Sequence, residues 1–169
     1  MCVFIFLAGH ETTTNGIASG VLALLQHPDE FAALKANPEA LLRGAVEEML
    51  RYESPVTRAV RQASEDFDFA GRRIHQGQLV VHLLGAANRD PAQFPDPDRF
   101  VIRRQPNKHL AFGYGAHFCL GAVLARLEME IAIRAIMQRL PDLRLVGGEL
   151  AWKPTMGIRA LKALPVMTS

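Results

Sequence analysis

Three stretches of the chain repeat apolar residues at helical spacing, and each predicts a helix. The first runs from about 3 to 26, contains a polar turn at 10–15, and ends at His27-Pro28. The second covers about 38–52, and a short helix that begins at Pro28 precedes it. The third covers about 120–140, with a predicted buried stripe of Leu120, Leu124, Leu127 and Ile131.

Between the second and third helices the pattern changes to short apolar runs separated by glycine and proline. Residues 56–63 and 79–84 are typical of strands, and the alternation in 67–74 predicts a hairpin. The proline-rich stretch 88–108 contains two phenylalanines that favour burial, so we expect an ordered meander. Short strand signals return at 143–166. The sequence therefore predicts a mainly helical α+β fold with a minor sheet and no linker.

Composition narrows the class of protein. Of the 169 residues, 49% are hydrophobic and 21% charged, and the net charge of +2 gives no basic excess for nucleic acid. The cysteines Cys2 and Cys119 lie far apart and offer neither a disulfide framework nor a zinc pair, which favours a reduced, cytoplasmic setting. The apolar start lacks the basic leader of an export signal, and Glu11 interrupts it, so we expect no membrane partner.

Cys119 carries the strongest chemical signal, because it follows a glycine-punctuated loop and precedes the third helix. Glycines let a backbone turn tightly and approach a flat ligand. The positive end of the following helix favours a thiolate, and a thiolate presented this way suits a haem iron. A lone cysteine is more often a small buried hydrophobic residue, so the surrounding residues have to decide between the two interpretations.

The pattern Phe-x-x-Gly-x-x-x-Cys-x-Gly is filled here by Phe112, Gly115, Cys119 and Gly121. This frame resembles the haem-ligand signature of the cytochrome P450 family, bacterial type. The resemblance implies haem b (iron protoporphyrin IX), with Cys119 as axial iron ligand, Phe112 and Gly113 beside it, and His117 bonded to a propionate. It also implies a monooxygenase that inserts one oxygen atom of O₂ into a small organic substrate. Electrons would come from a ferredoxin- or flavodoxin-type donor.

The first predicted helix carries Ala8-Gly9-His10-Glu11-Thr12-Thr13, in which Ala8, Glu11 and Thr12 fall on adjoining parts of one face. The segment resembles the family's oxygen-activation motif, Ala-Gly-x-Asp/Glu-Thr-Thr. That resemblance implies that Ala8 gives room beside the cofactor, Glu11 relays protons, and Thr12 holds water or oxygen. The alternative is a polar turn in a core helix, with hydroxyls bonded back to carbonyls.

Glu48 and Arg51 stand three residues apart in the second predicted long helix, a spacing that alone indicates only a marginal surface pair. They match the family's Glu-x-x-Arg motif, which forms a buried structural network with an arginine from the meander. The resemblance places that arginine at Arg99, within Pro97-Asp98-Arg99-Phe100.

Further basic residues have weaker assignments. Arg61, rather than Arg58, matches the basic residue that binds a haem propionate in the family, with solvent exposure as the alternative. An acidic ferredoxin could dock behind Cys119, and scattered surface charge is the competing interpretation. The positive charges considered for that docking are Arg103, Arg104, Lys108 and Arg126.

The motifs occur in the family's order, but family members are more than twice as long. We therefore expect residues 1–169 to form a single partial domain, the C-terminal haem-binding part of the P450 fold, with apolar surface exposed where partners are missing. Three interpretations follow: a fragment of a monooxygenase, a truncated haem-binding protein without turnover, or an inactive remnant.

Overall fold

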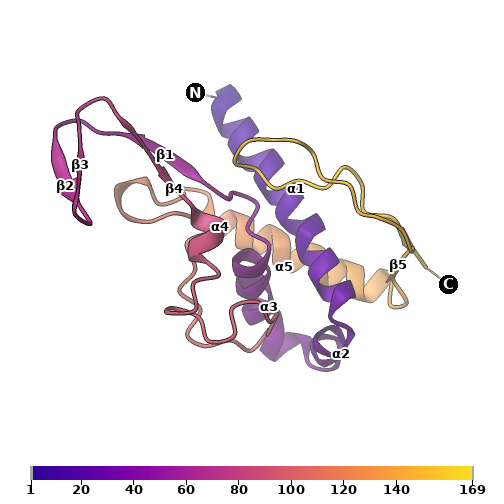
Figure 1. The fold of residues 1–169 in the computed structure, drawn as a ribbon. Coiled ribbons are helices and arrows are strands. Elements are labelled where there is room, and N and C mark those ends of the chain that lie inside the picture. Colours follow the sequence, from indigo (N-terminus) through magenta and orange to yellow (C-terminus); the bar gives the residue numbers. More distant parts are fainter. Residues whose placement is uncertain (1, 169) are drawn as a thin grey trace.

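Helices form the body of the molecule in the computed structural model, which describes residues 2–168. Helices α1 (Cys2–Gln26), α3 (Pro38–Tyr52) and α5 (Ala122–Arg139) pack on one another in pairs. The short helix α2 (Pro28–Ala36) connects α1 to α3 at one end of this group (Figure 1). The mainly helical fold predicted from the sequence is confirmed.

Prolines and one asparagine fix the boundaries of α2 and α3. Pro28 and Pro38 begin the two helices at positions where the missing N–H has no helical partner to lose. The backbone N–H of Asn37 donates to the Ala33 carbonyl at the end of α2. Its side chain accepts from the Ala40 amide at 3.3 Å and so caps α3. The start of α3 sets which residues of this helix face inward.

Short antiparallel strand pairs lie between α3 and α5. Strand β1 (Ala59–Gln62) pairs with β4 (Leu79–His82), and β2 (Phe67–Phe69) pairs with β3 (Arg72–Ile74). The β2–β3 hairpin projects away from the helices beyond β1 and β4 (Figure 1). The short helix α4 (Leu84–Ala87) follows β4 and leads into the meander.

The predicted strand regions are shorter in the structure, and the one at 79–84 ends at His82. At 56–63 regular pairing begins only at Ala59, and Val56 forms an isolated bridge with Ile158. At 143–166 the strands shrink to β5 (Arg144–Leu145) and β6 (Val166–Met167), which pair with each other. Short apolar runs therefore indicated pairing but overestimated its length.

The core lies where the C-terminal half of α1 meets α3 and α5. Leu24, Met49 and Ile133 are each 2% exposed or less. A Cβ at Gly20 of α1 would lie 2.8 Å from Met49 Sδ, so the absence of a side chain allows α1 to approach α3 this closely. Phe100 and Ile102 of the meander complete the cluster.

The buried face of α5 differs from the predicted one. The predicted stripe is exposed, at 99% for Leu120, 59% for Leu124, 51% for Leu127 and 59% for Ile131. The buried residues are instead Ala122, Met129, Ile133 and Met137. The prediction was wrong because α5 is apolar on two sides, while α1 and α3 cover only one of them. Periodicity identifies an apolar face but not the element that covers it.

The N-terminal half of α1 is also exposed and apolar. Val3, Ile5, Phe6 and Leu7 are each more than half exposed. The described helices include none with the length and hydropathy needed to cross a bilayer. Together with the outer side of α5, this half of α1 gives the molecule a large uncovered apolar surface.

Two isoleucines of α5 test this assignment of its faces. We expect Ile133→Ala to lower the free energy of unfolding by about 2–5 kcal/mol, because it leaves a cavity in the core. Ile131→Ala removes the same atoms from an exposed position and should change it by less than about 0.5 kcal/mol. Urea unfolding followed by circular dichroism measures both. Equal losses would show that the outer side of α5 is covered.

Candidate functional site

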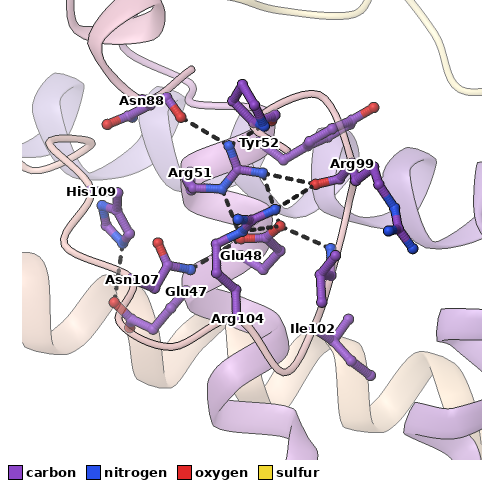
Figure 2. A network of polar contacts seen from close by, with 12 residues as sticks. Glu47, Glu48, Arg51, Tyr52, Asn88, Arg99, Ile102, Arg104, Asn107 and His109 are labelled. Atoms are coloured by element: carbon purple, nitrogen blue, oxygen red, sulfur yellow. Dashed lines mark hydrogen bonds and ion pairs between the residues drawn. The ribbon is translucent and has the colours of Figure 1, made fainter. Parts of the chain in front are cut away.

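The buried carboxylate of Glu48 organises the contact between α3 and the meander. Arg51, one turn further on, binds it through two hydrogen bonds of 2.8 and 2.9 Å. The Val101 amide donates to Oε1 at 2.8 Å, and Asn107 Nδ2 donates to Oε2 at 3.1 Å. The side chains of Glu48 and Arg51 are fully buried. Such a charge is stable in a protein interior only when it is paired throughout, as it is here (Figure 2).

The arginine that the meander contributes to Glu48 is Arg104, not the predicted Arg99. Arg104 Nε lies 3.1 Å from Glu48 Oε1, and its side chain is 8% exposed. The Arg99 side chain is 74% exposed, and its Nη1 lies 3.9 Å from the Asp96 carboxylate. Arg99 takes part through its carbonyl, which accepts from Arg51 and Arg104 at 3.0 Å each. The prediction failed because the irregular backbone turns the Arg99 side chain outward while its carbonyl points inward (Figure 2).

The meander ends in the loop that carries Cys119. The Cys119 amide donates to the Phe112 carbonyl at 2.9 Å and closes the loop. Gly113 and Gly115 have φ angles of +73° and +72°, which a residue with a Cβ rarely adopts. The short 3-10 helix Gly115–His117 lies between these ends. The loop thereby presents the Cys119 side chain on the exposed surface at the start of α5.

A second ionic group lies on the other side of this loop. Glu47, the neighbour of Glu48, binds Arg126 of α5 through Oε1 at 2.5 Å and Oε2 at 3.0 Å. His109 Nε2 lies 3.0 Å from the same Oε2. Burial alone raises the pKa of Glu47, but hydrogen bonds from His109 and Arg126 and their charges outweigh it and lower the pKa to about 2. The hydrogen bonds with Glu47 raise the pKa of Arg126, and the Cys119 sulfur contributes less.

The predicted oxygen-activation residues lie in α1, away from this network. Ala8 is exposed, and Glu11 and Thr12 are half-buried. The Thr12 hydroxyl donates to the Ala8 carbonyl at 2.6 Å, and Thr14 bonds in the same way to His10 at 2.7 Å. These are the back-bonds of the alternative interpretation, and α1 continues through them without a break.

The two predicted propionate ligands are both at the surface. Arg61 is exposed in β1, opposite Val80 of β4, and its Nη1 donates to the Val60 carbonyl at 2.8 Å. His117 is exposed at the end of the 3-10 helix. Arg58 lies against Gly157, where a Cβ would meet its Cγ at 3.2 Å. The structure leaves the guanidinium of Arg61 and the ring of His117 accessible to a ligand.

Two of the four charges considered for docking an electron donor are already paired. Arg104 is bound to Glu48, and Arg126 to Glu47. Arg103 and Lys108 are exposed. The positive surface behind Cys119 is therefore smaller than the sequence indicated, because a count of basic residues does not show which ones have buried partners.

Sequence reasoning missed several residues that hold the site. Glu47 and His109 were not singled out, and Arg104 and Arg126 were interpreted as surface charges. Asn88 accepts from Arg51 through its carbonyl at 2.9 Å and from the Leu110 amide through Oδ1 at 2.7 Å, so it ties α4 to the cysteine loop. The available signal was the pair of consecutive acids Glu47-Glu48 in an apolar helix, which requires cationic partners on two sides.

Known proteins resemble this chain over nearly its whole length. A family model described as Cytochrome P450 matches residues 1–141. The biotin biosynthesis cytochrome P450 of Bacillus subtilis is 54% identical over 165 residues, which cover 98% of this chain and 42% of that protein. The chain belongs to the cytochrome P450 family. Cytochrome P450 monooxygenase PikC of Streptomyces venezuelae is 55% identical over 169 residues, covering 98% of this P450 chain and 40% of PikC.

Solved P450 structures share the arrangement of this chain. P450BioI, in complex with an acyl carrier protein ligated with hexadec-9Z-enoic acid, superposes with a TM-score of 0.96 at 53% identity. That match covers 100% of this chain and 44% of the P450BioI chain. The chain thus spans about two fifths of the length of the P450 relatives it matches.

The residues around Cys119 fit the haem that this family implies. The sulfur is a suitable donor for haem iron, and it lies exposed beside apolar Phe118 and Leu120, which are 53% and 99% exposed. A flat apolar macrocycle could cover these side chains. A Cβ at Gly115 would meet nothing within 4 Å, so the loop leaves room on this side.

The two arginines of the meander give a direct test of the Glu48 network. We expect Arg104→Ala to lower the free energy of unfolding by about 3–5 kcal/mol, because it leaves the buried Glu48 carboxylate short of a partner. Arg99→Ala keeps the backbone carbonyl and should change it by less than about 0.5 kcal/mol. Urea unfolding of both variants measures the difference. A larger loss for Arg99→Ala would place that side chain in the network.

The lowered pKa of Glu47 predicts a pH dependence of stability. A carboxyl whose folded pKa is about 2, against an ordinary value of 4.5, stabilises the fold above pH 4.5 and loses that contribution as the pH falls toward 2. Over this window we expect the wild type to lose about 1–3 kcal/mol more than Glu47→Gln. Urea unfolding at several pH values measures both slopes. Parallel curves would contradict the assignment.

Proposed function

We propose that this chain is the haem-binding part of a cytochrome P450 monooxygenase that inserts one oxygen atom of O₂ into a small organic substrate. The observation that carries this proposal is the exposed Cys119 side chain at the end of a loop closed by the Cys119–Phe112 backbone hydrogen bond. Membership of the family and the monooxygenase names of relatives such as PikC support it. Bound haem b would supply the redox chemistry of oxygen insertion.

In this proposal the surface around Cys119 holds the cofactor. Cys119 provides the thiolate ligand, and Phe112 and Gly113 support its loop from behind. Arg61 and His117, both exposed, would bind the propionates through charge-assisted hydrogen bonds. Ala8, a small and exposed side chain of α1, would give room beside the cofactor.

The roles proposed for α1 follow from the hydrogen bonding of Thr12. Its hydroxyl already donates to the Ala8 carbonyl, so its oxygen lone pairs remain to accept a hydrogen bond from water. Thr12 would therefore position a water molecule as an acceptor. Glu11 precedes it, is half-buried, and would exchange protons between that water and solvent.

Electrons would come from a ferredoxin- or flavodoxin-type donor in the cytoplasm. Arg103 and Lys108 remain exposed on the meander and could attract an acidic partner. P450BioI was solved with an acyl carrier protein, so a carrier-bound substrate is one class to screen alongside free small molecules. A haem-binding protein without turnover is the second candidate, because the apolar sides of α1 and α5 are uncovered.

The carbon monoxide complex of the reduced protein tests the proposal. We expect the chain reconstituted with haem to show the red-shifted Soret band of thiolate ligation, and Cys119→Ala to lose it. Cys2→Ser is the matched control and should keep the band. Turnover with an added reductase separates the enzyme from a haem binder. A folded sample that takes up no haem would refute both.

A further inference from the structure

His109 and Arg126 contact the Phe112 ring, and Glu47 binds both of them. The Arg126 guanidinium lies over the Phe112 ring, 4.5 Å from its centroid, and the His109 ring centroid is 6.0 Å from that of Phe112. His109 also accepts the Ala111 amide through Nδ1 at 3.2 Å. Glu47 binds both side chains, so one carboxylate of α3 holds the two groups that contact this ring.

Phe112 passes these constraints to Cys119 through its backbone. Its carbonyl accepts the Cys119 amide at 2.9 Å, and its ring also contacts that of Phe118, with centroids 6.3 Å apart. The His109 side chain is 2% exposed, and those of Glu47 and Arg126 are 24% and 28% exposed. This degree of burial limits the alternative conformations of the three side chains.

We propose that Glu47, His109 and Arg126 form a clamp that positions the cysteine loop by fixing Phe112, whose carbonyl holds the Cys119 amide. The clamp requires only the contacts of this chain. Its consequence for ligation, that the sulfur is held in the orientation an iron ligand needs, rests on the function proposed above.

A second ion pair between the same two helices provides the control. Arg134 of α5 binds Glu39 of α3 with both terminal nitrogens, two turns from Arg126 or about 12 Å along the helix. The side chain of Arg134 is 38% exposed and that of Glu39 is 78% exposed. The two pairs share residue types and helices, but only Arg126–Glu47 contacts His109 and Phe112 among the described contacts. A general role in docking α5 on α3 would belong to both pairs.

Hydrogen exchange on the chain without haem tests the clamp directly. We expect the Cys119 amide to exchange about tenfold faster or more in Arg126→Gln, because the loop opens when Phe112 loses its support. Glu47→Gln should also speed exchange of the Cys119 amide. This second variant shows whether the effect of Arg126→Gln comes from a folding defect of that variant alone. Arg134→Gln should change the rate less than about twofold. The amide of buried Ile133 reports global opening and should stay constant in all three variants.

Spectroscopy of the haem-loaded protein tests the consequence for ligation. We expect a smaller share of the red-shifted Soret band in Arg126→Gln and Glu47→Gln, and the wild-type share in Arg134→Gln. An equal response of Cys119 exchange to Arg126→Gln and Arg134→Gln, or none to either, would overturn the clamp. If wild-type protein takes up no haem, the proposed function fails, while the exchange rates still decide on the clamp.

Discussion

The burial of one charge, the Glu48 carboxylate, determines where the irregular half of the molecule lies. A buried carboxylate is tolerated only when donors surround it, and the helix itself provides Arg51 alone. The remaining donors, the Val101 amide and the side chains of Arg104 and Asn107, come from the meander. The meander, which has no regular secondary structure, is therefore held in one position, because another would leave Glu48 with Arg51 as its sole partner.

Glu47 and Glu48, consecutive residues of α3, bind different parts of the region before α5. Successive side chains on a helix point about 100° apart, so Glu48 faces the meander while Glu47 faces the cysteine loop. Glu48 binds buried donors, and Glu47 binds the buried His109 at the end of the meander and the half-buried Arg126 of α5. Asn88 joins the two groups, since it contacts both Arg51 and the backbone of Leu110. The loop of Cys119 is thus anchored through α3 rather than by α5 alone.

Sequence reasoning succeeded where the signal is local. The helices and the frame of the cysteine loop follow from periodicity, prolines and glycines, which act over a few residues. It failed where two candidates differ only in tertiary surroundings. Arg99 and Arg104 lie in the same irregular stretch, and nothing local shows that one points outward and the other toward Glu48. The buried stripe of α5 was wrong for the same reason. The roles proposed for Thr12, Arg61 and His117 stay predictions.

The cysteine loop is held by more contacts than the N-terminal half of α1. The loop is closed by a backbone hydrogen bond and supported by the half-buried Glu47–Arg126 ion pair, whereas residues from Val3 to His10 of α1 are largely exposed wherever their side chains are described. A preorganised surface binds a flat ligand at a lower entropic cost than one that must be ordered first. In the proposed function, affinity for haem would therefore come mainly from the side of Cys119. The face that α1 contributes depends on whatever covers its apolar residues, so ligand binding and turnover place different demands on this chain.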